Sequence, residues 1–205
     1  MNQPRKSNIL VILCIVCICS LRILCNALAA PKDEGDKLIL AGERIGHAQL
    51  EMDGAKLDEL LGEPTTGDQA MSRISETWCS KSTDGEIQQL IVYLHAADEN
   101  RKHWAVTEAV VTSHFFHTPA GVTVLSEPAA IWREFPDLQY VDTAKTKDGV
   151  SVELYASAAN GIGFVIERNA QPAQGQTWGR CHALVVFKRG QMIGVPYLGD
   201  CEPVR

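Results

Sequence analysis

Beyond its N-terminal segment, this 205-residue sequence has no run of Lys or Arg longer than two residues, as in Lys188-Arg189. Residues 1–30 hold three of the 19 basic residues and none of the 25 acidic ones. Residues 31–205 therefore carry 16 basic and 25 acidic residues, a net charge of −9. Such a surface repels a phosphate backbone, and nucleic-acid binding usually depends on a basic patch. The composition predicts that nucleic acid is not a partner.

The sequence also lacks the motifs of common catalytic and phosphate-binding sites. It contains no Gly-x-Ser-x-Gly stretch that would present a nucleophilic serine. Residues 160–163 (NGIG) are too short for a phosphate-binding loop and are typical of a hairpin turn. We therefore predict no catalytic residue and no cofactor, with an enzyme of unfamiliar type as the remaining alternative.

Among possible metal ligands, only His114 and His117 have a suggestive spacing. Three residues apart on a helix, they would share one face. They fall at the end of a predicted strand, however, where residues i and i+3 point to opposite faces of the sheet. Neither a cysteine nor a carboxylate stands at ligand spacing beside them. We predict no metal site.

Residues 9–18 form an uninterrupted apolar stretch close to the N-terminus. Arg5 and Lys6 precede it, and residues 27–29 (ALA) offer an A-x-A cleavage site, which is the layout of a secretory signal peptide. The run is short for a membrane span, and Arg22 interrupts its continuation. We predict that residues 1–30 are a cleaved signal and that the protein is periplasmic or secreted. The alternative is that residues 9–28 anchor it to the inner membrane.

Only three of the seven cysteines, Cys79, Cys181 and Cys201, lie beyond the signal segment. Export places them in an oxidising compartment, where cysteines tend to pair, and an odd number leaves one thiol over. Cys181 opens a strand-like run that turns near residue 190, so a returning segment would bring Cys201 near it. We predict a Cys181–Cys201 disulfide and a free Cys79.

The most informative pattern present is an internal match at an offset of 75 residues. The apolar residues of the first copy are matched in the second as Leu50 with Leu125, Leu57 with Trp132, and Leu60 with Phe135. Further along, residues 109–111 (AVV) are matched by 184–186 (LVV) at the same offset. A fixed offset at both ends predicts one supersecondary plan used twice.

Each copy reads as a helical segment followed by strands. Apolar spacing predicts helical turns over 50–61, ended by Gly62 and Pro64, and over 129–135, with Ser126 as N-cap and Pro136 as the stop. Predicted strands cover 74–79, 87–95, 104–116, 150–154, 161–168 and 182–188. We predict an α+β fold of two tandem ~75-residue units, each a short helix followed by about three antiparallel strands, packed as one body. The predicted boundaries are 31–41 for a leader, 42–117 and 118–190 for the units, and 191–205 for a C-terminal tail.

The lead-in and first helix, residues 46–64, resemble a recurring motif of exported bacterial proteins. It consists of residues 50–53 (LEMD), the helix over 57–61, and then Gly62-Glu63-Pro64, with the lead-in repeated as Gly121-Val122. The pattern resembles the superfamily of β-lactamase inhibitory protein and the small outer-membrane barrel-assembly lipoproteins. This resemblance implies tandem units of helix and antiparallel sheet, and an inhibitor-like or assembly-related role. The second half has residues 135–138 (FPDL) in place of Leu-Gly-x-Pro, and no contact residue of the inhibitor is carried over.

Aromatic residues are the best candidates for a contact surface. Sheet aromatics that face solvent often mark interfaces, because Trp, Tyr and Arg dominate binding hot spots. The alternative is that these rings cover the edge of the core. The candidates near strand ends, in loops or on the polar side of a strand are Trp78, Trp104, Tyr155 and Trp178.

Together these patterns predict an exported, non-catalytic protein-binding module of the bacterial cell envelope. Its partner would be another protein, engaged through the surface of the sheet. A structural envelope protein, held to the membrane by an uncleaved N-terminal segment, is the alternative.

Overall fold

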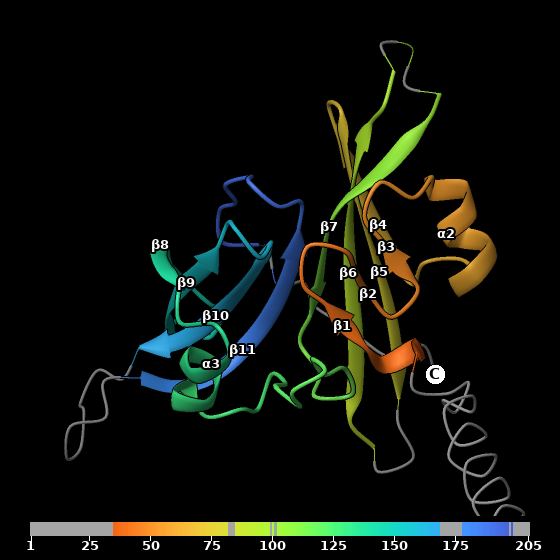
Figure 1. The fold of residues 1–205 in the computed structure, drawn as a ribbon. Helices are drawn as coiled ribbons and strands as arrows, with labels where there is room; N and C mark the ends of the chain where they lie inside the picture. Colours follow the sequence, from red (N-terminus) through yellow and green to blue (C-terminus); the bar gives the residue numbers. More distant parts are fainter. Residues whose placement is uncertain are drawn as a thin grey trace, which may run out of the picture. The chain divides into compact units, whose positions relative to one another are not determined.

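The computed structural model describes residues 35–81, 85–98, 100, 102–168, 178–196 and 198, with Trp178 described by its backbone only. The described chain forms two antiparallel sheets and two α-helices (Figure 1). A 3-10 turn, η2 (Gly35–Lys37), precedes a small sheet of β1 (Ile39–Leu40), β2 (Arg44–Ile45) and β3 (Ala48–Gln49). The two α-helices are α2 (Gly54–Leu61) and α3 (Pro128–Glu134).

The large sheet has eight strands in the order β4-β5-β6-β7-β11-β10-β9-β8, so the chain runs from one edge to the centre and later returns from the opposite edge. The strands are β4 (Thr66–Ala70), β5 (Arg73–Lys81), β6 (Ile87–Ala96), β7 (Trp104–Val111), β8 (Gln139–Lys145), β9 (Ser151–Ser157), β10 (Ile162–Arg168) and β11 (Trp178–Phe187). At the centre, β7 pairs with β11, and Val110 lies opposite Val185. The two strand segments that match at an offset of 75 residues are thus hydrogen-bonded neighbours.

The predicted α+β fold of two tandem helix-and-strand units is wrong. The described chain is mostly β, and its two α-helices contain only eight and seven residues. The strands form one continuous sheet in place of two packed units, because β7 and β11 are hydrogen-bonded to each other. The edge strands β4 and β8 were missed, since their mostly exposed polar residues give no alternating pattern.

The ends of the helices follow from local chemistry. Asp53 caps α2 by accepting a hydrogen bond from the backbone N–H of Ala55 at 2.9 Å, and Gly62, at φ +78°, ends the helix as predicted. In α3, Pro128 occupies the first turn, but the N-cap residue is Glu127, without a side-chain cap. Ser126, the predicted cap, instead accepts a hydrogen bond from the backbone N–H of Thr123.

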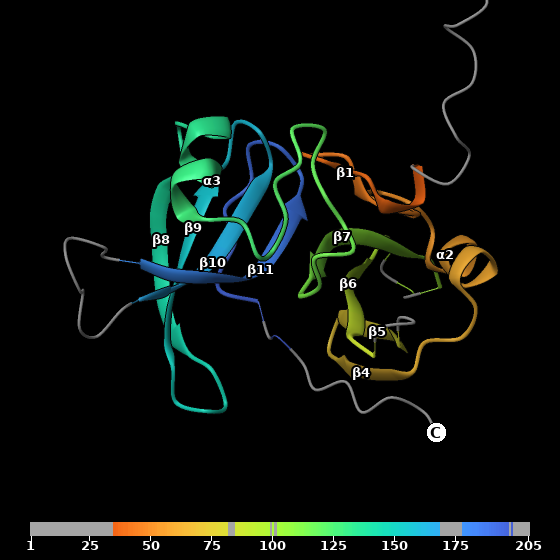
Figure 2. The same cartoon turned by 90° about the horizontal axis from the view of Figure 1, so that it is seen from below.

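The large sheet is apolar on both faces. The face that we call the helix face packs against α2, α3 and the small sheet, through residues such as Leu57, Ile131 and Phe164. The opposite face, which we call the tail face, carries a second cluster centred on Val110 and Val185. Residues 193, 195 and 198 of the chain after β11 pack onto it. Figure 2 shows this chain leaving β11 on the side away from α3 and β1.

Residues assigned to the leader belong to this fold. Ile39, in β1, is fully buried in the helix-face cluster. The turn after β1 meets the turn between β9 and β10, where the backbone N–H of Gly42 donates to the carbonyl of Gly161 at 3.0 Å. The small sheet is therefore fixed to the β8–β11 half of the large sheet by a direct backbone contact.

Candidate protein-interaction surface

Two of the four predicted contact residues, Trp78 and Trp104, are half-buried where α2 meets the large sheet. The indole N–H of Trp78 donates to the carbonyl of Gly62 at 2.9 Å and so ties the end of α2 to β5. Trp104 lies beneath the start of α2, where a Cβ added to Gly54 would stand 3.6 Å from the Cβ of Trp104. These contacts favour the alternative that both rings cover the core edge. The side chain of Trp178 lies outside the described residues.

Tyr155 belongs to a different arrangement, which we call the aromatic ladder: Trp132 on α3, Tyr155 on β9 and Tyr140 on β8. The ring of Tyr155 meets that of Trp132 edge to face at 5.0 Å and that of Tyr140 at 6.0 Å. Exposure increases along the ladder, from half-buried Trp132 and Tyr155 to Tyr140 at 56%. Edge-to-face pairs of this kind are favourable beyond the area that they bury. The inner rings therefore hold Tyr140 in place at the edge of the sheet.

Hydrogen bonds and an ion pair fix the ladder from the side. The hydroxyl of Tyr155 donates to Oε2 of Glu153 at 2.7 Å, and Oε1 of Glu153 pairs with Arg168 at 3.2 Å. Glu153 is only 8% exposed, whereas Arg168 is exposed. A carboxylate at that depth needs partners, and the phenol and the guanidinium supply them. The ladder thus has a fixed geometry and an exposed cation beside it.

Sequence reasoning identified Tyr155 but missed Tyr140. Tyr140 is the second residue of β8, an exposed, polar edge strand without hydrophobic alternation, so its sequence does not mark it as part of a sheet. The relevant signal is the strand register, which places Tyr140 directly opposite Tyr155. The sequence alone does not give this register, which follows only from the pairing of β8 with β9.

The predicted Cys181–Cys201 disulfide is contradicted by Cys181, which is a free and fully buried thiol. Burial raises the pKa of the Cys181 thiol to about 12. Cys79, predicted to be free, is disulfide-bonded. Because Cys181 is free, the partner of Cys79 lies outside the described residues, as does Cys201. The prediction failed because Cys181 faces the helix face of the sheet, whereas the returning chain crosses the tail face.

The two histidines considered as ligands lie apart from any larger polar cluster. β7 ends at Val111, so both follow the strand rather than ending it. His114 faces Glu86, with 3.0 Å between Nδ1 and Oε2, and Nδ1 of His117 lies 3.0 Å from the carbonyl of Thr118. Within the described ranges, no three His, Cys, Asp or Glu side chains gather as metal ligands would.

Open hollows flank the chain after β11 on the tail face. One is lined by Arg73, Tyr93 and Glu108 together with residues 192–196. Arg73 stacks over the ring of Tyr93 at 4.3 Å and pairs with Glu108 at 3.2 Å. Burial raises the pKa of Glu108, and Arg73 opposes that shift. Arg73 is thus engaged by both Tyr93 and Glu108. The polar side chains of this hollow interact with one another, and their arrangement does not suggest a reactive site.

Glu76 lies on the helix face of the sheet, within electrostatic reach of Asp58 on α2. Its Oε2 is buried without a hydrogen-bond partner, and burial, with a smaller contribution from Asp58, raises the pKa of the group. A raised pKa means that the folded protein favours the protonated form. The associated loss of stability is therefore absent below the ordinary value of 4.5 and grows as the pH rises through the raised folded pKa.

We expect Glu76→Gln to raise the melting temperature at pH 7 by about 2 °C, because the amide removes an uncompensated charge from a half-buried position. The gain should shrink as the pH falls towards 4. Thermal melts between pH 4 and pH 8 check this, with Glu63→Gln in the exposed loop after α2 as the matched control. A variant less stable than the parent at pH 7 would contradict the assignment.

No helix in the described part of the chain is long and apolar enough to cross a membrane. Residues 9–28, the alternative anchor, and the predicted cleavage site lie outside the described residues. Comparisons of this chain with family models, with curated proteins and with solved structures found no match.

Proposed function

We propose that this protein is an exported, non-catalytic protein-binding module of the bacterial cell envelope, and that the aromatic ladder is its contact surface. One observation carries the proposal: the Tyr140 ring is 56% exposed yet is held from behind by Tyr155. A preorganised ring loses little conformational entropy on binding. Trp, Tyr and Arg are also the residues that most often dominate binding energy, and the exposed Arg168 lies beside the ladder.

The shape of β8 favours contact through side chains over the addition of a strand. β8 is an edge strand, which leaves one row of backbone groups without a neighbouring strand. Its register shifts between Tyr140 and Asp142, so Val141 forms a bulge. Bulges bend an edge and discourage pairing with another chain. The side chains around Tyr140 are therefore the better point of recognition.

Charge and targeting support the remainder of the proposal. The net charge of −9 beyond residue 30 favours a partner with a complementary basic surface. The signal-like residues 1–30 support export, and the resemblance noted above supports an inhibitor-like or assembly-related role. Retention of residues 9–28 would instead favour the membrane-anchored structural protein. The mass of the exported protein separates the two, since cleavage after residue 29 leaves a chain that begins at Ala30.

We expect Tyr140→Ala to weaken partner binding about tenfold or more, because it removes the exposed end of the ladder. Its melting temperature should change by no more than about 2 °C, since the ring is more than half exposed. Wild-type and variant proteins immobilised at equal density would be compared for the envelope proteins that they retain, quantified by mass spectrometry.

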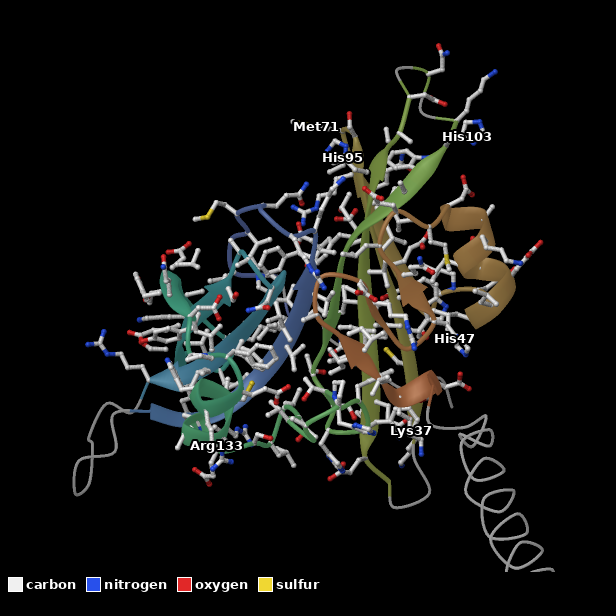
Figure 3. The ribbon with its side chains drawn as sticks, viewed as in Figure 1. Lys37, His47, Met71, His95, His103 and Arg133 are labelled. Atoms are coloured by element: carbon white, nitrogen blue, oxygen red, sulfur yellow. The ribbon has the colours of Figure 1, made fainter. Side chains whose placement is uncertain are left out.

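The matched control is Met71→Ala, which removes another exposed apolar side chain. Met71 is 86% exposed and lies between β4 and β5. Figure 3 shows it far from Arg133, which marks α3. The aromatic ladder would not be the contact surface if both variants lost partner binding equally. The same conclusion would follow if Tyr140→Ala bound its partner as the wild type does.

A further inference from the structure

The large sheet opens at the end of β7. β11 pairs with β10 over residues 178–186 but with β7 only over residues 184–187. Beyond β7 the chain stays beside β6, where the hydroxyl of Thr112 donates to Oε1 of Gln89 at 2.8 Å. Figure 1 shows this chain and β11 running apart beyond the paired segment. In the described part of the chain, no strand pairs with residues 178–183 on the side of β7.

A hollow with a volume of about 680 Å³ lies at this opening. Gln89 and Thr112 line it on one side, and residues 180–182 of β11 line it on the other. Its size is within the range of small-molecule sites, roughly 300–1,000 Å³. Much of the remaining wall is apolar, with side chains contributed by Val124, Leu125, Val150, Val152 and Val195. The hollow therefore offers an apolar surface beside the open edge of β11.

Gln89 brings an unpaired hydrogen-bond donor to this hollow. Its side chain is only 5% exposed, and its Oε1 already accepts the hydrogen bond from Thr112. Its Nε2 is buried and has no hydrogen-bond partner among the residues that the structure describes. A buried amide N–H without an acceptor destabilises the protein, and native structures rarely leave one unpaired. An acceptor atom bound in the hollow would supply the missing partner.

The lining of the hollow also carries an excess of positive charge. Its basic residues are Lys145, Lys147 and Arg180. Asp148 is the one acidic residue among the described residues that line it, and His182 is engaged by Glu167 at 3.2 Å. This local excess contrasts with the net charge of −9 over residues 31–205. A positive hollow on an acidic protein favours an anionic ligand.

We propose that this hollow binds an organic acid in which a carboxylate is joined to an apolar chain. The carboxylate accepts a hydrogen bond from Nε2 of Gln89 and is attracted by the basic side chains of the lining. The apolar chain covers the valine side chains of the wall. An inorganic anion would leave that wall uncovered, and an uncharged hydrocarbon would leave the amide of Gln89 unpaired. A ligand with both parts matches both features of the hollow.

Calorimetric titration of the purified full chain with octanoate tests this proposal. Octanol, which lacks the charge, and butyrate, which lacks most of the apolar chain, are the matched probes. We expect one octanoate to bind per chain, at least about tenfold more tightly than either probe. Equal binding of octanol would show that the carboxylate is not recognised. Equal binding of butyrate would indicate an adventitious ion only, and absence of octanoate binding would likewise overturn the proposal.

Variants of the lining locate the bound carboxylate. Arg180→Gln and Gln89→Leu should each weaken octanoate binding about tenfold, because each removes a group that interacts with the carboxylate. Arg180 is exposed, so its replacement should leave the melting temperature nearly unchanged. The matched control is Arg133→Gln, an equally exposed arginine on α3 that does not line the hollow. Wild-type affinity in Arg180→Gln, or an equal loss in Arg133→Gln, would contradict the assignment.

A peptide with a free C-terminus carries the same carboxylate, and one further probe separates the two sources. Acetyl-Val-Val-Leu with a free carboxylate should bind no more tightly than octanoate. Tenfold tighter binding of this peptide would replace the organic acid with a protein C-terminus as the ligand.

The proposal does not rest on the aromatic ladder, whose three residues do not line the hollow. Tyr140→Ala should therefore bind octanoate as the wild type does. Loss of octanoate binding in that variant would show that the hollow is not a separate site. Failure of the ladder to bind a partner protein leaves the hollow's ligand unaffected, so the two proposals can fail separately.

Discussion

Replacing Phe164 by alanine is expected to lower the free energy of unfolding by about 3–5 kcal/mol. Phe164 lies in β10 with no solvent exposure, and its ring packs at 5.4 Å from that of Phe135. Its removal loses the transfer free energy of the ring and leaves a cavity between α3 and the sheet. Because a domain of this kind is usually stable by about 5–15 kcal/mol, the loss is a large fraction of the total.

Denaturant unfolding measures this loss as a shift in midpoint at an unchanged slope. Leu125→Ala is the matched control, since Leu125 is apolar but 57% exposed. It should change stability by no more than about 0.5 kcal/mol. Similar losses in the two variants would mean that Phe164 is not at the centre of the helix-face core.

Gly161→Ala is expected to destabilise the protein by about 4 kcal/mol or to prevent folding, which places it among the exceptional substitutions. Gly161 has φ +72°, a conformation that L-residues rarely adopt. An added Cβ would stand 2.3 Å from the carbonyl oxygen of Phe187 and 2.7 Å from the Cα of Gly42. Both are backbone atoms, so relief requires the turn between β9 and β10 to move away from the small sheet and from β11.

Gly149→Ala separates the two causes. Gly149 has a similar φ, +78°, but an added Cβ there would meet nothing within 4 Å. It should cost only the conformational strain, about 1–2 kcal/mol. Comparing the two free energies of unfolding isolates the contribution of close backbone approach. Equal losses would show that the contact between Gly42 and Gly161 contributes nothing.

The strands that sequence patterns located are those with at least one buried face. Residues 162–168 of β10, for example, carry Ile162, Phe164 and Ile166 on the helix face, and this alternation predicted the strand to within one residue. The remaining strands were missed for different reasons. β4 is exposed along its whole length, and β1, β2 and β3 are two residues each, too short for any period to show.

The core was predicted less accurately than the strands. The presence of apolar residues in a helix does not by itself show which of them point into the core. The 75-residue offset aligned Leu57 with Trp132, yet the fully buried residue of α3 is Ile131. It likewise aligned Leu60 with Phe135, although Leu60 is 43% exposed and Phe135 is buried. A shift of one residue turns a helical side chain by about 100°, which is enough to exchange a core position for a surface one.

The candidate site was predictable only in part, for a related reason. Tyr155 could be identified from its place on the polar side of an alternating strand. Tyr140 could not, because its importance comes from a cross-strand neighbour. The predicted cysteine pairing was wrong for a similar reason, because the sequence does not show which face of the sheet each segment occupies. Proximity along the chain suggested Cys181 for Cys201, but the two faces of the sheet separate Cys181 from the C-terminal segment.

The pairing of β7 with β11 also has a consequence for how the protein folds. β4 to β7 follow one another along the chain and pair with their nearest neighbours, as do β8 to β11. Joining the two halves requires residues such as Val110 and Val185, 75 positions apart, to find each other. Long-range contacts of this kind slow folding, because the entropy cost of closing the loop comes before the favourable contacts form. We therefore expect β4–β7 and β8–β11 to form early as two local meanders, and the pairing of β7 with β11 to limit the folding rate.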